Sequence, residues 1–213
     1  MTEPLSSSQS ETVPLTTKRR DWIDHWQRVA RRIRVPLGFV VAALYLYELG
    51  MNEPRSAAVL GSLALVLPGL WLRGYSAGYV KKNRELTTTG PYAYTRNPLY
   101  LGSMLIAAGF AVALLSWPVG IVLAVGFFLI YVPVIASEER FLRDAFGGFD
   151  RYCQQVPRLI PRLTAARMQS ESGRFSFSLY WKHREYNAAM GTALLYLSLL
   201  LRPLLVGLLH GSR

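Results

Sequence analysis

The sequence predicts an all-α fold, an integral membrane helical bundle of about five transmembrane helices with a polar pocket on the cytoplasmic side. Three observations support this fold class. The chain of 213 residues is 51% hydrophobic and only 17% charged, a balance that favours a lipid environment. Its apolar residues gather in five runs, and most of its basic residues lie between those runs.

The five apolar runs are the predicted spans. A helix rises about 1.5 Å per residue, so about 20 residues cross the hydrocarbon core. The first two runs are therefore short unless their flanks extend them, whereas the last three are long enough. Short connections predict that runs one and two, and runs three and four, form antiparallel hairpins. The runs are residues 35–50, 56–72, 98–116, 118–136 and 188–209.

The distribution of basic residues predicts the orientation. The chain has 24 Lys and Arg against 13 Asp and Glu, and all but three of the basic residues lie in residues 1–34, 73–97 and 137–187. Basic segments stay cytoplasmic during insertion, which places the N-terminus and both long polar loops inside. Topology and anionic lipid thus explain the positive charge. Binding to nucleic acid would leave the five apolar runs unexplained.

The chain divides into three predicted parts. Residues 1–17 are polar and have no apolar core, so we expect a disordered tail and not a cleavable signal peptide. Residues 18–34 predict an amphipathic helix at the membrane interface, or alternatively a basic anchor without fixed structure. Residues 35–213 form the membrane domain. The apolar face of the predicted interfacial helix carries Trp22, Trp26, Val29 and Ile33.

Two single residues limit the interpretation. Cys153 is the only cysteine, so no internal disulfide forms and no zinc cluster is expected. Arg202 lies inside the fifth run and Pro203 follows it. A charge at the centre of a bilayer costs about 3 kcal/mol on insertion scales. We therefore expect this segment to be kinked, shallow or turned toward an oligomer partner.

The first polar constellation is KKNRELTTTGPYAYTRNPLY, residues 81–100. Gly90-Pro91 predicts a turn, and Pro98 predicts the first turn of the third span. Free N–H groups at that helix N-terminus would favour an anion. Tyrosine rings in the segment suit a heterocycle or a cation. Tyrosines also mark membrane boundaries, but that alternative does not explain the fixed proline and glycine positions. The tyrosines are Tyr92, Tyr94 and Tyr100.

The second constellation is residues 137–163, which follow the fourth span. Two adjacent glutamates, Glu138 and Glu139, would meet the unfavourable end of the helix dipole if the helix ended there. We therefore expect the helix to continue to Gly147-Gly148. Adjacent helical residues point about 100° apart, so at most one glutamate should face a site and the other should face solvent or an arginine. The alternative is that both glutamates make only structural ion pairs.

Together the motifs REL-x-T-x-GPYAYTRNPLYLG and EERFLRDAFG-x-x-x-RY-x-x-x-VPRLIP, separated by an apolar hairpin, resemble the isoprenylcysteine carboxyl methyltransferase family and its relatives among the phospholipid methyltransferases. The similarity covers roughly residues 80–163. It implies an integral membrane enzyme that binds S-adenosyl-L-methionine on the cytoplasmic side and receives a lipid substrate from the bilayer. Methyl transfer is displacement at carbon, so no metal is expected.

The resemblance also implies roles for individual residues. Arg96 and Glu139 belong to the same motifs and are the catalytic candidates on the substrate side. The implied cofactor contacts are Arg84, Glu85, Leu86, Thr87, Tyr92, Asn97, Pro98, Leu99, Tyr100 and Glu138.

The sequence departs from the family pattern at two positions, and these leave the acceptor open. Asn97 replaces a histidine and cannot carry a titrating proton. Val134 replaces an arginine associated with the prenylcysteine substrate. A carboxylate acceptor would then need another cation, from Arg96, Arg158 or Arg162. An amine acceptor, as in an aminophospholipid, would need a base, for which Glu139 is the nearest candidate. A non-catalytic membrane scaffold is the third possibility.

Overall fold

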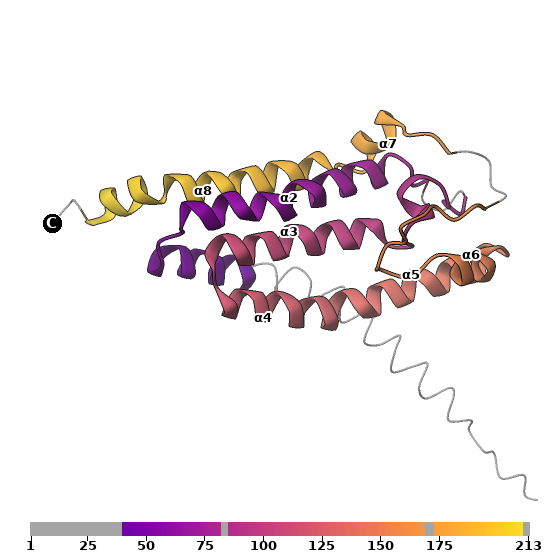
Figure 1. The fold of residues 1–213 in the computed structure, drawn as a ribbon, viewed down its shortest axis with the longest axis horizontal. Helices are drawn as coiled ribbons and strands as arrows, with labels where there is room; N and C mark the ends of the chain where they lie inside the picture. Colours follow the sequence, from indigo (N-terminus) through magenta and orange to yellow (C-terminus); the bar gives the residue numbers. More distant parts are fainter. Residues whose placement is uncertain (1–39, 82–84, 169–172, 211–213) are drawn as a thin grey trace, which may run out of the picture.

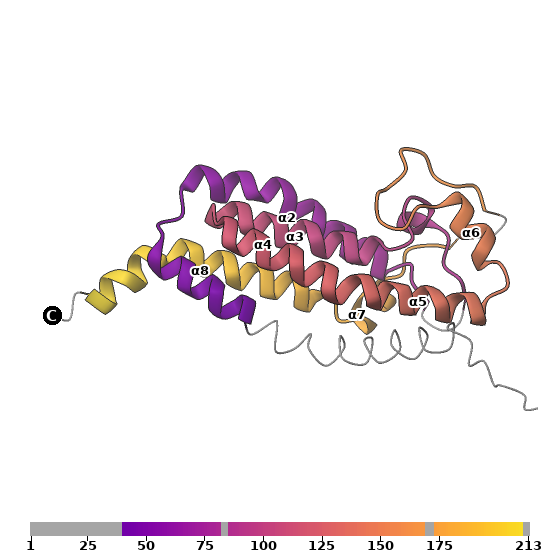
Figure 2. The ribbon, with the colours of Figure 1, turned by 90° about the horizontal axis from the view of Figure 1, so that it is seen from below.

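The structure, a computed structural model, describes residues 40–81, 85–168 and 173–210, with side chains as far as residue 202. Over these residues the chain is helical, and its long helices lie side by side along one axis (Figures 1 and 2). The predicted tail and interfacial helix, residues 1–34, lie outside the described residues.

All five apolar runs form helices, and several extend beyond the predicted bounds. The second run continues to Ala77, and the fourth continues to Ala145, as the glutamate pair led us to expect. The elements are the helix Val40–Met51, α2 Ser56–Ala77, the 3-10 turn η1 Gly90–Ala93, α3 Pro98–Leu114, α4 Trp117–Gly126, a π turn Phe127–Tyr131, α5 Val132–Ala145, α6 Phe149–Gln155, α7 Phe177–Lys182 and α8 Tyr186–His210.

Within the described ranges, two helices are long and apolar enough to cross a membrane by length and composition, Ser56–Ala77 and the continuous helix Trp117–Ala145. The third predicted span forms a helix of only 17 residues, Pro98–Leu114, which is shorter than expected. Only 17% of the most apolar window of each of the two long helices is buried inside the protein. A core helix of a soluble protein would be mostly buried. Large apolar side chains such as Leu60, Trp71 and Phe128 are instead exposed, as expected if lipid covers them.

The closest helix pair is α2 with α3, and small residues make this approach possible. A Cβ atom added at Gly69 would lie 2.8 Å from the Gly102 carbonyl oxygen, and one added at Gly102 would lie 2.7 Å from the Gly69 oxygen. A Cβ at Gly109 would lie 2.3 Å from a methyl group of Val66. Membrane helices commonly use such residues to bring backbones together.

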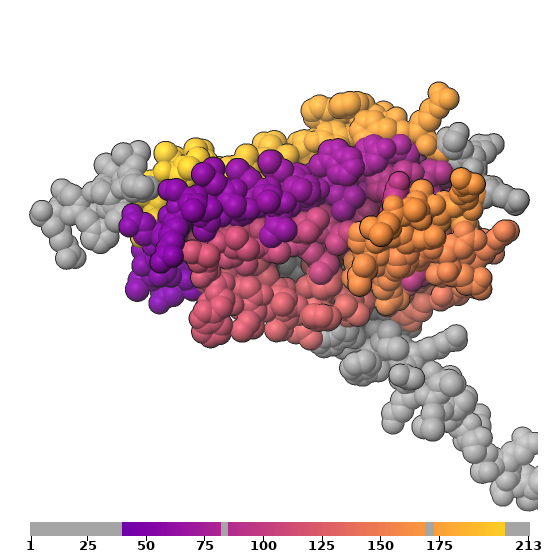
Figure 3. Space-filling model, in the orientation of Figure 1, coloured from indigo at the N-terminus to yellow at the C-terminus, as the bar shows by residue number. Residues whose placement is uncertain are grey.

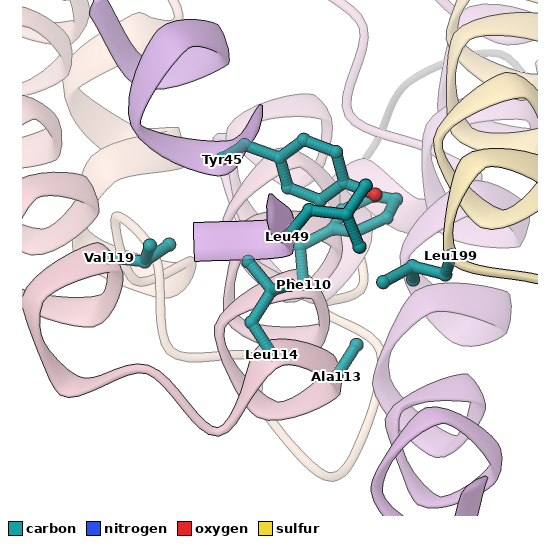
Figure 4. Close-up of a cluster of buried hydrophobic side chains, with 7 residues drawn as sticks. All are labelled: Tyr45, Leu49, Phe110, Ala113, Leu114, Val119 and Leu199. Atoms are coloured by element: carbon teal, nitrogen blue, oxygen red, sulfur yellow. The ribbon is translucent and has the colours of Figure 1, made fainter. Parts of the chain in front are cut away.

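An apolar cluster packs the helices together at the end of the bundle opposite α6 (Figure 1), and Figure 4 shows its side chains. Tyr45 packs edge-on against Phe110, with ring centroids 6.1 Å apart, and its hydroxyl donates to the Leu195 carbonyl at 2.9 Å. The cluster joins the helix Val40–Met51 to α3, α4 and α8. Its buried members are Tyr45, Leu49, Phe110, Ala113, Leu114, Val119 and Leu199.

Arg202 has polar partners within the chain. Its Nε donates to the Leu49 carbonyl at 2.6 Å and its Nη2 to the Gly50 carbonyl at 3.5 Å, while Nη1 lies 3.6 Å from the Glu53 carboxylate. Basic side chains stabilise the last carbonyls of a helix in this way. The helix also continues past Arg202. The guanidinium therefore caps the helix Val40–Met51, a solution that the sequence did not suggest.

Candidate functional site

The two polar constellations meet at one end of the bundle and enclose a pocket of about 390 Å³, a volume typical of small-molecule sites. The described members of the implied catalytic and cofactor-contact sets all line it, and Arg84 lies outside the described residues. Tyr94, Arg158 and Arg162, which the sequence analysis also offered for ligand contacts, are not among its lining residues. A cofactor role for the lining residues stays a prediction. The implicated lining residues are Glu85, Leu86, Thr87, Tyr92, Arg96, Asn97, Pro98, Leu99, Tyr100, Glu138 and Glu139.

Gly90 and Pro98 shape the first wall of this pocket. Gly90 has a φ of 60°, and a Cβ there would lie 2.7 Å from the Tyr79 ring. Only glycine fits such a position without strain. The chain then forms η1 and enters α3 at Pro98, the first helical residue, as predicted. Among the described residues no side chain caps the α3 N-terminus, and the start of a helix favours an acceptor or an anion.

Backbone hydrogen bonds join this loop to the segment after α6, which the sequence analysis did not anticipate. Arg96 N–H donates to the Pro157 carbonyl at 2.9 Å, and Arg162 N–H donates to the Tyr94 carbonyl at 3.0 Å. The buried Thr95 hydroxyl donates to the Leu159 carbonyl at 3.1 Å. The paired prolines of VPRLIP were the available signal, since they predict an extended segment that needs partners.

An apolar cluster beneath the loop supports the same wall. Phe149, Tyr152 and Val156 are each at most 2% exposed. The Tyr152 hydroxyl donates to the Tyr92 carbonyl at 2.7 Å. Burial raises the pKa of both tyrosines, Tyr92 and Tyr152, above the ordinary value of 10. Both phenols are therefore neutral at physiological pH.

Glu139 holds the second wall to the first. Its side chain is 7% exposed and accepts from Arg158 Nε at 3.0 Å. Arg96 Nη1 lies 3.4 Å from its other oxygen, where Asn97 Nδ2 also donates at 3.4 Å. The hydrogen bond to Glu139 raises the pKa of Arg158. The expectation that one of the two glutamates meets an arginine is met at Glu139.

Glu138 has a different environment. It is exposed and accepts a hydrogen bond of 2.9 Å from the Tyr100 hydroxyl. Among the described residues it makes no ion pair, although it lines the pocket. The two glutamates differ in their partners, but the prediction that at most one of them faces the site is wrong, because both line the pocket.

The arginines proposed from sequence as substitutes for the one missing at position 134 are engaged elsewhere. Arg158 binds Glu139, and Arg162 Nη1 donates to the Gln155 carbonyl at 2.5 Å. Arg96 Nη1 donates to Cys153 Sγ at 2.5 Å. Arg96 Nε is buried and has no acceptor among the described residues. These contacts hold the loop against α5 and α6.

Sequence reasoning missed Arg73 and Glu185, which line the pocket as well. Arg73, near the end of α2, makes a bidentate contact with Glu185 at 2.8 to 3.1 Å and also donates to the Ser103 hydroxyl. Glu185 lies between α7 and α8, after Arg184, which has a φ of 54°. A single charged residue in the apolar α2 was the available signal, because intramembrane charges usually serve a site.

A second, apolar pocket of about 490 Å³ lies between α3 and the helix of α4 and the π turn. Ser103 and Tyr131 line both pockets, so we call the place where they stand the neck. The Tyr131 ring contacts Tyr100 edge-on and stacks on Phe127, with centroids 5.3 Å apart in both cases. The surface is hollowed between α3 and α4–α5 in Figure 3.

No group of three or more His, Cys, Asp or Glu side chains that could hold a metal ion occurs within the described ranges. The site consists of carboxylates, guanidinium groups and tyrosines, which suit an organic ligand that carries charges and a ring system.

Comparison with known proteins shows sequence similarity over a segment that includes many of the pocket residues. Residues 59–148 match the sequence model of the phospholipid methyltransferase family. The chain is 38% identical over 143 residues to the cobalt-zinc-cadmium resistance protein CzcN of Cupriavidus metallidurans, covering 64% of this chain and 65% of that protein. It is 35% identical over 115 residues to the nickel-cobalt-cadmium resistance protein NccN of Alcaligenes xylosoxydans xylosoxydans, covering 54% and 53%.

The alignments span less than two thirds of the length of either relative. No solved structure matches the chain significantly. The segment that matches the family runs from α2 past the end of α5 and includes Arg73, η1, Glu138 and Glu139. Residues 59–148 are thus similar to the phospholipid methyltransferases.

Proposed function

We propose that this protein is an S-adenosyl-L-methionine-dependent methyltransferase that acts on a membrane-embedded lipid. The observation that carries the proposal is a pair of adjacent pockets that share lining residues. A polar pocket made by the two motif segments shares Ser103 and Tyr131 with an apolar pocket among the helices. A polar cofactor and a lipid chain would therefore meet at the neck.

The polar pocket fits the chemical groups of the cofactor. The uncapped α3 N-terminus suits its carboxylate. Glu138, which has no cationic partner among the described residues, suits a ribose hydroxyl of the cofactor, from which one carboxylate oxygen can accept a hydrogen bond while the other faces the acceptor. The rings of Tyr92 and Tyr100 suit the adenine or the positively charged sulfur. The bound cofactor would supply an electrophilic methyl group, and the chain would orient the acceptor in line with it.

The structure bears on the choice of acceptor atom. A carboxylate acceptor, as on an isoprenylcysteine, needs a cation close to it, yet Arg96 and Arg158 are both engaged by Glu139. An amine acceptor needs a base and a site that tolerates positive charge. Glu138, beside the Tyr100 and Tyr131 rings, offers both. These contacts favour the amine version and move the base from Glu139, as first expected, to Glu138.

Two measurements test the function on the full chain in detergent. Calorimetric titration with S-adenosylhomocysteine should give a saturable heat, and Glu138→Gln and Tyr100→Ala should weaken binding while expression is kept. Arg151→Gln, an exposed residue of α6, is the matched control. If wild-type protein gives neither heat nor thermal stabilisation at millimolar ligand, the methyltransferase assignment fails and the scaffold alternative is favoured.

The second measurement identifies the acceptor class. Purified protein is incubated with methyl-labelled S-adenosyl-L-methionine and total lipid extract, and the labelled lipid is treated with mild base. Label that survives base indicates an amine product, whereas released label indicates a carboxyl ester. Release of all label would overturn the amine version while leaving the methyltransferase assignment intact.

A further inference from the structure

Arg73 is a charged residue near the end of an otherwise apolar membrane helix. Its side chain is 25% exposed and borders the polar pocket. Charges in such helices are costly and are usually retained for a site or pathway. Its contact with Glu185 explains how α2 is tied to the turn before α8, but it does not explain why the guanidinium lies at the neck.

The fold brings the Arg73 guanidinium to the neck by leaving space on α3. A Cβ atom at Gly102 would lie 2.7 Å from Arg73 Cγ, so only a glycine lets the side chain pass over α3. The guanidinium then reaches Ser103, which lines both pockets. The Ser103 hydroxyl donates to the Leu99 carbonyl at 2.9 Å, so its one proton is used and it faces Arg73 as an acceptor.

The guanidinium keeps a donor for a ligand. Nε and Nη2 bind the Glu185 carboxylate, and Nη1 binds Ser103. Each terminal nitrogen carries two N–H groups, and the second N–H of Nη1 has no acceptor among the described residues. A tetrahedral or planar oxyanion could accept from it and could share the fork with Glu185.

The order of chemical groups along a lipid indicates which group would accept a hydrogen bond from Arg73 Nη1. A lipid with its tail in the apolar pocket and its methyl-accepting end beside Glu138 must pass its linker through the neck. In a phospholipid that linker is a phosphate diester. Arg73 stands at the neck, and Glu138 and Glu139 line the polar pocket away from it. This order of charges matches an acceptor that is anionic in its linker and cationic at its end.

We propose that Arg73 binds an oxyanion, a phosphate diester or a carboxylate, in the linker of the lipid acceptor, at the neck between the two pockets. The proposal rests on the proposed function, because it concerns the acceptor of that reaction. Glu185 orients Arg73 and competes with the ligand for it. Arg73 is then a determinant of acceptor specificity, whereas Glu138 and Tyr100 serve the reacting end.

Small ligands with one alkyl chain test whether Arg73 binds a lipid oxyanion, without knowledge of the natural acceptor. Binding of dodecyl phosphate, dodecanol and inorganic phosphate is measured by calorimetry with the full chain in a neutral maltoside detergent. Wild-type protein should bind dodecyl phosphate at least about tenfold more tightly than dodecanol. Arg73→Gln should abolish this preference and leave dodecanol binding unchanged. Glu185→Gln should increase the preference for dodecyl phosphate over dodecanol, because this exchange removes the competing carboxylate. The control Arg151→Gln should match wild type.

The opposite effects of the two variants separate ligand recognition from packing. If Arg73 only pins α2 to α8, both Arg73→Gln and Glu185→Gln should lower thermal stability and weaken all probes together, which overturns the proposal. Equal affinity of wild type for dodecyl phosphate and dodecanol also overturns it. Binding of inorganic phosphate as tight as that of dodecyl phosphate would overturn a lipid source for the oxyanion. If Arg73→Gln does not fold, the preference of Glu185→Gln for dodecyl phosphate over dodecanol decides: an increase supports the proposal, and a decrease overturns it.

Titration with S-adenosylhomocysteine distinguishes the remaining source of an oxyanion, the cofactor carboxylate. Arg73→Gln should bind this ligand like wild type. Weakened binding would assign Arg73 to the cofactor and overturn its role toward the acceptor. If wild-type protein fails to bind S-adenosylhomocysteine at all, the proposed function fails, and that result is independent of the probe preference.

Discussion

Glu138 and Glu139 are neighbours in the chain, but the helix gives them different tasks. Glu139 is buried against Arg158, Arg96 and Asn97, whereas Glu138 is exposed and contacts the Tyr100 hydroxyl. A carboxylate that binds two guanidinium groups holds structure together. A carboxylate that meets only a phenol is available to a ligand.

Exchange of each glutamate for glutamine should therefore affect different properties. Glu139→Gln leaves two arginines without their counter-charge and should cost about 2 to 3 kcal/mol. This is below the range of about 3 to 5 kcal/mol for fully buried pairs, because the Arg158 side chain is 46% exposed. Glu138→Gln should leave the free energy of unfolding unchanged and weaken binding of S-adenosylhomocysteine. Thermal unfolding and calorimetry on both variants check this, and a destabilised Glu138→Gln would contradict it.

The buried phenols predict a loss of stability in alkali. Burial raises the pKa of Tyr92 and Tyr152 in the folded protein above the value of 10 expected for an unfolded chain. Below pH 10 both states are protonated and pH has no effect through these groups. Above pH 10 the unfolded chain loses protons first, so each phenol should lower stability by about 1.4 kcal/mol per pH unit.

Thermal unfolding between pH 9 and 11.5 measures this slope. Tyr92→Phe should show a shallower fall above pH 10 than wild type, because one of the two phenols is gone. A wild-type curve that stays flat to pH 11.5 would refute the assignment of these groups.

At the level of elements, the α2–α3 contact positions both the neck and Arg73. Gly102→Ala would place a methyl group 2.7 Å from the Gly69 carbonyl oxygen. The helices must then separate, at a cost of about 1 to 3 kcal/mol. Gly61→Ala is the matched control, because a Cβ there meets nothing within 4 Å. Thermal unfolding should show a loss for Gly102→Ala and none for Gly61→Ala, and equal effects would contradict the close contact.

The π turn Phe127–Tyr131 sets the rotation of everything that follows it in α5. A π turn holds one residue more than an α-helix needs, and each residue of a helix turns it by about 100°. Deletion of Phe128, which is exposed, removes this surplus residue, so the turn should become α-helical while Glu138 and Glu139 keep their direction toward the pocket. Circular dichroism should show retained helix, and calorimetry should show retained binding of S-adenosylhomocysteine. Loss of binding with retained helix would contradict a one-residue surplus in the turn.

The sequence predicted the elements well because apolar runs and prolines report on them locally. The run to Ala145 and the helix start at Pro98 follow from local rules, and the structure confirms both. The π turn was not predictable, because Phe127–Tyr131 reads as an ordinary apolar helix. The contact of Arg73 with Glu185 was also missed, since it joins residues 112 positions apart and depends on how α2 and α8 pack.

At the scale of the whole molecule, the polar pocket lies at one end of the bundle. The helix α6 lies at that end, and the connection between the helix Val40–Met51 and α2 lies at the other (Figures 1 and 2). The excess of basic residues in the loops near the pocket predicts that the pocket faces the cytoplasm. A cytoplasmic pocket is also where a soluble cofactor would reach a lipid held between helices.

The single cysteine makes this orientation directly measurable. Cys153→Ser removes the native thiol while keeping an acceptor for Arg96, and new cysteines are then placed at Met51 or Leu163, both exposed. An impermeant maleimide added to intact cells should label Met51→Cys, whereas Leu163→Cys should react only after lysis. Labelling with the reverse pattern would invert the orientation. Labelling of both from outside would mean that the helices between them do not cross the bilayer, because residues at opposite ends of a spanning bundle cannot face the same solvent.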